Sequence, residues 1–271
     1  MNVPMVELDE VRVTFPNRGA NRGVSGRGRH GRVVAVDGVS LAVARGECVG
    51  IVGDSGCGKS TLVRTIVGLQ KADSGRVLIE GQSLGPHDDR ARKRRIQLVF
   101  QDPYSALNPA MKVGSVLGEL LAVHRLVPRN RIRARCGELL DAVGLSPDYL
   151  DAYPQALSGG QRQRVSIARA LALQPEILLA DEVVSALDVS IQADILNLLI
   201  RLRRELELTV LFISHDLAVV RQLCERVLVM HQGKVVESGS VERVFSDPHD
   251  AYTRTLLASI PRIAFAAEAP E

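Results

Sequence analysis

Three glycines, a lysine and several hydroxyl residues lie close together in the segment GDSGCGKST, residues 53–61. The apolar stretch before it predicts a strand and the stretch after it predicts a helix, which is the context in which Gly-x-x-x-x-Gly-Lys-Ser binds phosphate. Glycines let successive backbone N–H groups face a phosphate at close range, and the lysine adds a full charge worth about 4 kcal/mol at about 4 Å. The residues predicted to contact the phosphates are Gly53, Asp54, Ser55, Gly56, Cys57, Gly58, Lys59, Ser60 and Thr61.

A carboxylate pair ends the apolar segment ILLADE, residues 177–182. The hydroxyl of Ser60 is expected to bind Mg²⁺, which then needs a carboxylate from elsewhere in the chain. A buried strand would bring Asp181 to that metal, and Glu182 just beyond it can polarise an attacking water. Alone, such a pair is an ordinary strand end. Together with the phosphate loop it predicts hydrolysis of a nucleotide.

A second glycine turn occurs in LSGGQRQR, residues 157–164, about a hundred residues after the first. Ser158 precedes a helix-forming run, so it is placed to cap that helix while the N–H groups of Gly159 and Gly160 face outward. These groups form a second anion site. One nucleotide cannot occupy both sites of one chain, because the phosphate loop already surrounds it on the sheet side.

The elements that must position these residues alternate between strand and helix patterns. A strand is expected in VELDEVRVTF, and the stretch from 33 to 69 predicts two short strands, a glycine turn, an apolar strand and a helix. Residues 110–152 are expected to be mostly helical with a break at Pro128, and RARKRR, residues 90–95, to be a solvated helix face. Strands EILLAD and TVLFIS follow, and then a hairpin turning at Gln232 and Gly233. This order predicts an α/β protein with a parallel sheet and a helical insert.

The composition is that of an ordinary globular protein. Of the 271 residues 46% are hydrophobic and 24% charged, and the net charge of +3 is too small to argue for nucleic acid. The four cysteines show no metal-site spacing, which favours a reducing compartment, and Cys57 is interpreted as a small filler, with a redox-sensing thiolate as the alternative. The first residues lack the pattern of a signal peptide, and no apolar run reaches the ~18 residues of a membrane span.

One basic segment interrupts the pattern. Residues 16–32 contain five Gly and five Arg and no acidic residue. We interpret them as a flexible, solvated surface loop, with contact to anionic lipid headgroups or to another subunit as the alternative.

Taken in order, the motifs resemble the ATP-binding cassette (ABC) ATPases. The resemblance rests on the phosphate loop, Gln101 after IQLVF, LSGGQRQR, ILLADE, SALD at 185–188 and His215 in ISHD, and it spans residues 5–260. It implies a P-loop NTPase fold with a RecA-like core, an N-terminal antiparallel β subdomain and a helical subdomain. As one domain, 1–271 would comprise a core lobe of about 1–101 and 156–240, a helical lobe of about 102–155 and a tail of 241–271.

The resemblance also implies roles for individual residues. ATP and Mg²⁺ would be the ligands, and two chains would form a head-to-tail dimer in which Ser158, Gly159, Gly160 and Gln161 of one chain close on the ATP held by the other. Gln101 would sense the γ-phosphate and Mg²⁺, His215 would hold the γ-phosphate in the transition state, and Asp188 would connect the two sites. Phe15 would stack on adenine, or else it is a core phenylalanine.

The wording of the motifs is most similar to the ATPases of dipeptide and oligopeptide importers, whose relatives include nickel importers, and among them to the second of two ATPase subunits. A second ABC ATPase, identical or similar, two transmembrane permeases and an extracytoplasmic solute-binding protein are then the expected partners, at the cytoplasmic face of the membrane. The rival class is a soluble ABC ATPase without a transport role. Three departures are visible: Val183 replaces the usual proline after Glu182, DPHDAYT lacks His-Pro before Tyr-Thr, and the tail has no cysteine cluster. The sequence leaves the transported substrate open.

Overall fold

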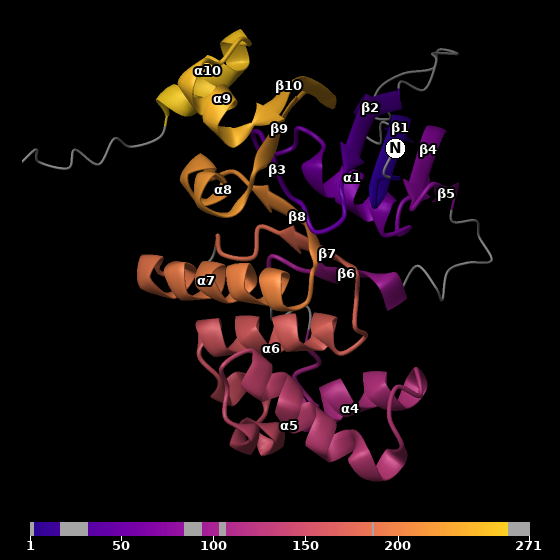
Figure 1. Cartoon of the computed structure of the whole chain (residues 1–271), viewed down its shortest axis with the longest axis vertical. Coiled ribbons are helices and arrows are strands. Elements are labelled where there is room, and N and C mark those ends of the chain that lie inside the picture. Colours follow the sequence, from indigo (N-terminus) through magenta and orange to yellow (C-terminus); the bar gives the residue numbers. More distant parts are fainter. Residues whose placement is uncertain (1–2, 17–31, 84–93, 103–106, 186, 260–271) are drawn as a thin grey trace, which may run out of the picture.

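The larger of two sheets holds the centre of the molecule (Figure 1). The computed structural model describes residues 3–16, 32–83, 94–102, 107–185 and 187–259. Within them the sheet has six strands in the order β10-β9-β3-β8-β7-β6, and every neighbouring pair is parallel except β9 and β10. The strands are β3 (Cys48–Val52), β6 (Ile96–Val99), β7 (Ile177–Asp181), β8 (Thr209–Ser214), β9 (Arg226–His231) and β10 (Lys234–Ser240). The expected parallel α/β sheet is confirmed.

The hairpin expected between the last two strands is also present. Gln232 and Gly233 both have positive φ, 47° and 83°, which is the backbone of a type I′ turn between β9 and β10. The sequence pair Gln-Gly thus determines how β10 folds back along β9.

The smaller sheet is antiparallel and formed by the N-terminal part of the chain. Its order is β2-β1-β4-β5, with β1 (Val6–Pro16), β2 (Arg32–Val43), β4 (Ser74–Ile79) and β5 (Gln82–Ser83). Pro16 pairs with Arg32 across the β1–β2 hairpin. The interior of the basic segment 16–32 lies outside the described residues.

The expectation of two short strands in the region of β2 is wrong. Val36 pairs with Val13 and Val39 with Val11, so a single strand, β2, continues past Asp37 and Gly38 through a bulge. Gly38 has a φ of 66°, and the N–H of Asp37 donates to the carbonyl of Gly233 at 2.8 Å. Pairing with β1 and the hydrogen bond to the β9–β10 turn therefore hold the bulge of β2 in place.

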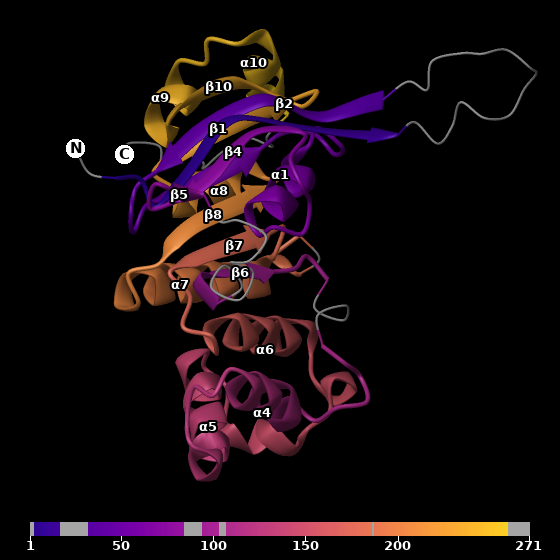
Figure 2. The same ribbon diagram turned by 90° about the vertical axis from the view of Figure 1, so that its right-hand side faces the viewer.

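Side chains of the core sheet alternate between two separate hydrophobic clusters. On β8, Val210 and Phe212 join the cluster beneath the helices, whereas Leu211 and Ile213 join the cluster beneath the antiparallel sheet. The first cluster is covered by α7 (Val189–Glu205), α8 (Leu217–Leu223) and α9 (Val241–Ser246), and the second by α1 (Lys59–Ile66) and strands β1 and β2 (Figure 2). A sheet buried on both faces explains its apolar inner strands, such as β3 and β8.

Between β6 and α6 the described chain is helical. It comprises α4 (Val113–Val123), α5 (Ile132–Ala142) and the short 3₁₀ turns at Arg129–Arg131, Pro147–Asp151 and Pro154–Ala156. The break predicted at Pro128 is confirmed, since this residue precedes the first of those turns. Helix α6 (Gly159–Leu171) contacts α4 and α5 on one side and β6 and α7 on the other, so it joins the helical region to the core sheet.

Of the basic run RARKRR, Arg94 is helical and exposed as expected of a solvated helix face, whereas Arg95 is held by ion pairs. Residues 90–93 lie outside the described part of the chain, but Arg95 is half-buried and pairs with Glu80 and with Glu176 at 2.6 Å. Arg45 pairs with the same two carboxylates. Hydrogen bonding from Arg95 holds the pKa of Glu80 below its ordinary value. Two arginines and two glutamates thus form one network of ion pairs, which joins the antiparallel sheet to the amino ends of β6 and β7. Its members are Arg45, Glu80, Arg95 and Glu176.

The chain ends, within the described residues, in α10 (Ala251–Ala258). Although the usual His-Pro is missing, Asp250 caps this helix by accepting the N–H groups of Tyr252 and Thr253. No helix of the described ranges is both long and apolar enough to cross a membrane.

Candidate functional site

The predicted phosphate loop lies at the carboxyl end of β3, between that strand and the first turn of α1. Gly58 precedes the helix with a φ of 112° and supplies no side-chain cap, so the first N–H groups of α1 keep their capacity for an anion. A side chain at Gly58 would place Cβ 2.2 Å from the carbonyl oxygen of Ala35, and one at Gly53 would lie 2.1 Å from that of Met230. The glycines are therefore required by neighbouring strands as well as by a ligand.

Lys59 is a buried cation inside this loop. Only 4% of the residue is exposed, and its ammonium donates to the carbonyl oxygens of Gly53 at 2.5 Å and Asp54 at 2.9 Å. Dipoles of two carbonyls compensate a buried charge only in part, and an anionic phosphate would complete the compensation. Cys57 is buried beside it, which agrees with its interpretation as a filler.

Asp181 ends β7 next to the first turn of α1. Burial raises the pKa of this carboxyl and so does the charge of Glu182, while a hydrogen bond from Ser60 and the charges of Arg64 and Lys59 act in the opposite direction. A hydroxyl and a carboxylate held together are hard oxygen donors of the kind that Mg²⁺ takes alongside phosphate oxygens and water. The residues present therefore fit the predicted metal.

Glu182 is contacted by side chains of two other segments, a hydrogen bond from Gln101 and a pairing with the ring of His215. Its Oε2 lies 3.0 Å from Nε2 of Gln101 and 3.3 Å from Nδ1 of His215. The backbone of Glu182 is left-handed, with a φ of 48°, and its N–H donates to Ile213 at 3.0 Å. Such a conformation costs about 1 kcal/mol or more in a non-glycine residue, and at this position it directs the carboxylate to Gln101 and His215. The structure thus brings together the three residues predicted to act at the γ-phosphate.

Ser185 belongs to this cluster and was missed at the sequence level. Its hydroxyl donates to the carbonyl of Glu182 at 2.9 Å and accepts from Nε2 of Gln101 at 3.3 Å. The segment SALD was noted for Asp188, and the only local signal for Ser185 is its place three residues after Glu182 in a turn.

The second glycine turn begins α6. The Ser158 hydroxyl accepts the N–H of Gln161 at 3.3 Å, and the Gln161 side chain accepts the N–H of Ser158 at 2.9 Å, so the two form a capping box. Gln161 also donates to Tyr149 at 2.9 Å. In both ribbon views α6 and α1 lie on opposite sides of β6 and β7 (Figures 1 and 2). The structure does not bring Ser158 to the phosphate loop of its own chain.

Two further predicted residues are exposed. Asp188 begins α7 without a hydrogen bond from its side chain to that helix, which leaves its carboxylate outside the helix cap. Phe15 is 38% exposed near the end of β1 and belongs to neither hydrophobic cluster. Its interpretation as a core phenylalanine is therefore disfavoured.

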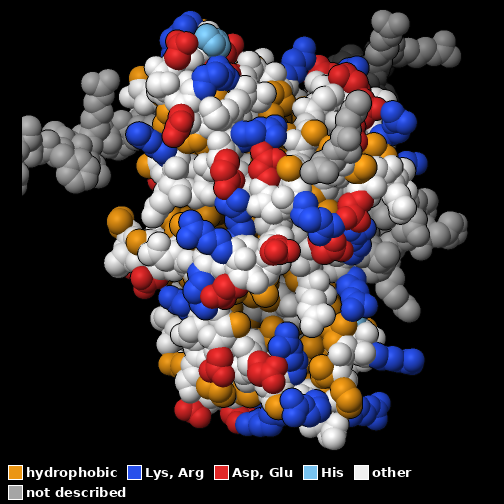
Figure 3. Space-filling view, viewed as in Figure 1, with side chains coloured by type: hydrophobic (Ala, Val, Ile, Leu, Met, Phe, Trp, Pro, Cys, Tyr) orange, Lys and Arg blue, Asp and Glu red, His pale blue; other side chains and the backbone are white. Residues whose placement is uncertain are grey.

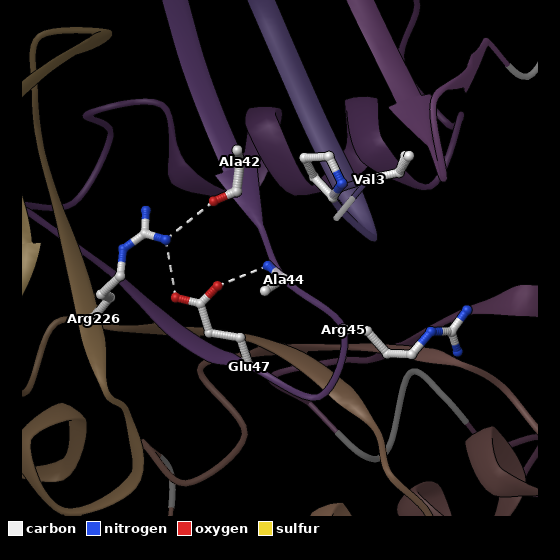
Figure 4. A pocket seen from close by; sticks show the side chains of 7 residues that line it. Val3, Ala42, Ala44, Arg45, Glu47 and Arg226 are labelled. Atoms are coloured by element: carbon white, nitrogen blue, oxygen red, sulfur yellow. Dashed lines mark hydrogen bonds and ion pairs between the residues drawn. The ribbon is translucent and has the colours of Figure 1, made fainter. Parts of the chain in front are cut away.

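A hollow at the amino ends of the core strands β3 and β9 is not part of this site. It lies beside Glu47, just before β3, whereas the phosphate loop follows β3 (Figure 4). Glu47 accepts the N–H of Ala44 at 2.7 Å and pairs with Arg226 at 2.9 Å, and Arg45 pairs with Glu80 and Glu176. Because these charges are satisfied by one another, the hollow offers no chemistry comparable with that around Lys59.

The close approach of Ala35 to Gly58 gives a test of the phosphate loop. We expect Gly58→Ala to weaken binding of a fluorescent ATP analogue by about tenfold more than Gly56→Ala, since overpacking costs about 1–3 kcal/mol and 1.4 kcal/mol is a factor of ten. Gly56 is the matched control because its φ of 80° is also positive but its Cβ would meet nothing within 4 Å. Equal losses in the two variants would contradict the assignment of a steric role to Gly58.

Comparisons with known proteins agree with this geometry. The family model described as ABC transporter matches residues 36–185. The oligopeptide transport ATP-binding protein AppF of Bacillus subtilis is 46% identical over 95% of this chain and 78% of its own length. The oligopeptide transport ATP-binding protein OppF of Escherichia coli is 48% identical over 84% of this chain and 69% of its own length.

Solved structures show the same likeness. CbiO1 from Clostridium perfringens, described as part of the ABC transporter complex cbiONQ, has a TM-score of 0.76 and 29% identity, covering 96% of this chain and 97% of its own. The ATP-binding cassette MJ0796, described as a dimer in a post-hydrolysis state with ADP and phosphate, has a TM-score of 0.74 and 32% identity over 88% of this chain and 99% of its own. The P-loop NTPase fold, nucleotide binding and ATP hydrolysis follow, and this chain belongs to the family of ABC transporter ATP-binding proteins.

Proposed function

We propose that the chain is the ATP-hydrolysing subunit of an importer for dipeptides, oligopeptides or a related small solute. The proposal rests on the convergence of Gln101, His215 and Glu182. They meet at the carboxyl ends of the strands of the core sheet, where β3 leads into the phosphate loop. The named relatives are peptide transport ATP-binding proteins, which supports the substrate class.

In the proposed reaction a water attacks the γ-phosphorus in line with the bond to ADP, and that bond breaks. Glu182 polarises the water by accepting its hydrogen, while His215 and Gln101 donate to the γ-phosphate region. Lys59 and the N–H groups of the phosphate loop bind the phosphates and neutralise charge that develops in the transition state. Ser60 and Asp181 would hold Mg²⁺, which supplies further neutralisation of the β- and γ-phosphate oxygens.

A head-to-tail dimer accounts for the second glycine turn. The first turn of α6 lies across the sheet from the phosphate loop of its own chain, yet Ser158 is exposed and its hydroxyl hydrogen can still be donated. In such a dimer, the ATP bound to the phosphate loop of each chain would lie against the second glycine turn of the other chain. Both the phosphate loop and the glycine turn of each chain would then contact a nucleotide. Asp188, exposed at the start of α7, would lie between the two sites. Phe15, exposed near the hairpin end, would stack on adenine.

The remaining partners of the proposal follow from its transport role. Two transmembrane permeases would hold the ATPase pair at the cytoplasmic face of the membrane, and an extracytoplasmic solute-binding protein would deliver the solute to the permeases. On the face shown in Figure 3, basic and acidic side chains are interspersed, which suits protein contacts better than a nucleic-acid backbone.

The test is affinity purification of the tagged chain from detergent-solubilised membranes, with mass spectrometry of the proteins retained. We expect two multi-span permeases and an ABC ATPase partner, and the attached binding protein would then identify a ligand to assay. The untagged chain, taken through the same purification, controls for proteins that adhere to the resin. Recovery from the soluble fraction alone, or with ribosomes or DNA, would overturn the importer assignment.

A further inference from the structure

One peptide group of the phosphate loop is held from both sides. The N–H of Asp54 donates to the hydroxyl oxygen of Tyr252 at 2.8 Å, and the carbonyl of Gly53 accepts from the ammonium of Lys59 at 2.5 Å. These two groups belong to the same planar peptide unit, so fixing its N–H also fixes the direction of its carbonyl. Tyr252 of α10 and the ammonium of Lys59 therefore bind the two ends of one peptide group.

Tyr252 is positioned by one contact of its backbone and one of its ring. Asp250 accepts its N–H at 2.8 Å in the cap of α10, and the ring lies against that of His231 with centroids 4.0 Å apart. Burial raises the pKa of Tyr252 to about 12, so the hydroxyl is protonated at neutral pH and its oxygen accepts the amide of Asp54 without carrying a charge.

The segment before α10 is anchored by a buried carboxylate on β10. Glu237 accepts the N–H groups of His249 at 3.0 Å and Asp250 at 3.1 Å, and it pairs with Arg243 at 3.2 Å. Burial by itself raises the pKa of Glu237, but these hydrogen bonds outweigh it and hold the pKa below its ordinary value. The anchor is therefore ionised at neutral pH, and α10 is attached to the same hairpin that carries His231.

We propose that Tyr252 is a positioning residue of the nucleotide site, which orients the Gly53–Asp54 peptide so that its carbonyl directs the ammonium of Lys59. Gly53 has a φ of 148°, and glycine lets this peptide rotate at little cost when nothing holds its N–H. Hydrogen bonds in series also strengthen one another, so loss of the hydroxyl weakens the bond to Lys59 as well. The proposal rests on the proposed function, since it assumes that ATP occupies this loop.

Tyr252→Phe in the full-length chain tests the proposal, because it removes the hydroxyl and retains the ring against His231. We expect the KM for ATP to rise about 3- to 10-fold, the effect of one neutral hydrogen bond, with kcat within about twofold of the parent. Tyr153→Phe is the matched control, since Tyr153 is exposed and remote in sequence from the loop. Its KM should equal that of the parent.

Amide hydrogen exchange of the same variants separates positioning from loss of structure. For Tyr252→Phe we expect faster exchange in residues 53–58 with exchange in β10 unchanged. An unchanged KM, or faster exchange confined to 250–258 with the loop unaffected, would overturn the proposal. If the parent chain itself neither binds nor hydrolyses ATP, the proposed function fails instead, so the two failures are distinguishable.

Discussion

Glu182→Gln should lower the steady-state rate of ATP hydrolysis by about 10²- to 10⁴-fold, the range over which a general base contributes. The amide has the shape of the carboxylate and its oxygen can still accept a hydrogen bond, but it is too weak a base to take the proton of the attacking water. ATP binding should persist, because Lys59 and the phosphate loop supply the affinity and neither contacts the side chain of Glu182 in the hydrogen bonds described. Phosphate release and titration with a fluorescent nucleotide measure the two quantities separately.

Glu205→Gln provides the matched control for this substitution. Glu205 ends α7 on the surface and pairs there with Arg201 at 3.6 Å. Exposed pairs of this kind contribute less than about 1 kcal/mol, so turnover and binding should both equal those of the parent. If Glu182→Gln hydrolysed ATP at the rate of the parent, Glu182 could not be the general base.

Ser158→Arg should abolish hydrolysis of the ATP that the partner subunit holds against Ser158 in the proposed dimer. The nucleotide affinity of the variant chain's own phosphate loop should be unchanged. The exposed start of α6 lies across β6 and β7 from α1, so in the proposed dimer a bulky cation there would meet the partner's nucleotide rather than its own. The isolated chain is titrated with a fluorescent nucleotide, and the assembly purified from membranes is assayed for ATPase activity.

The control for this second substitution separates bulk from capping. Ser158 also caps α6, and loss of a cap costs about 1 kcal/mol. Ser158→Ala loses the cap and the hydroxyl without adding bulk, so its ATPase activity should lie between those of the parent and Ser158→Arg. A fall in own-loop affinity in Ser158→Arg would contradict the arrangement in trans.

Local sequence patterns predicted the parts of the fold that local chemistry decides. Gly53 to Lys59 needs a strand before it and a helix after it, and Gln232-Gly233 supplies the two positive φ angles of its turn. The apolar strand that ends in Asp181 could be placed in a parallel sheet for the same reason. These signals lie within a few residues of the structure that they specify.

The misses depend on residues far apart in the chain. The continuous strand β2 is held by pairing with β1 and by a hydrogen bond from Asp37 to Gly233, neither of which the local Asp-Gly pair reveals. Ser185 meets Gln101 across 84 positions, and Tyr252 meets Asp54 across 198. Family resemblance identified both SALD and the Tyr-Thr segment as motifs, but only packing shows which atoms they contact.

The capping box at Ser158 has a consequence for the reversibility of the transport cycle. One hydroxyl oxygen accepts an N–H of its own helix and retains a hydrogen for a phosphate, so both roles can operate at once. Approach and departure of a second subunit's nucleotide then leave the internal hydrogen bonds of α6 intact. In the proposed dimer, the start of α6 would therefore not have to refold when the subunits separate after each turnover.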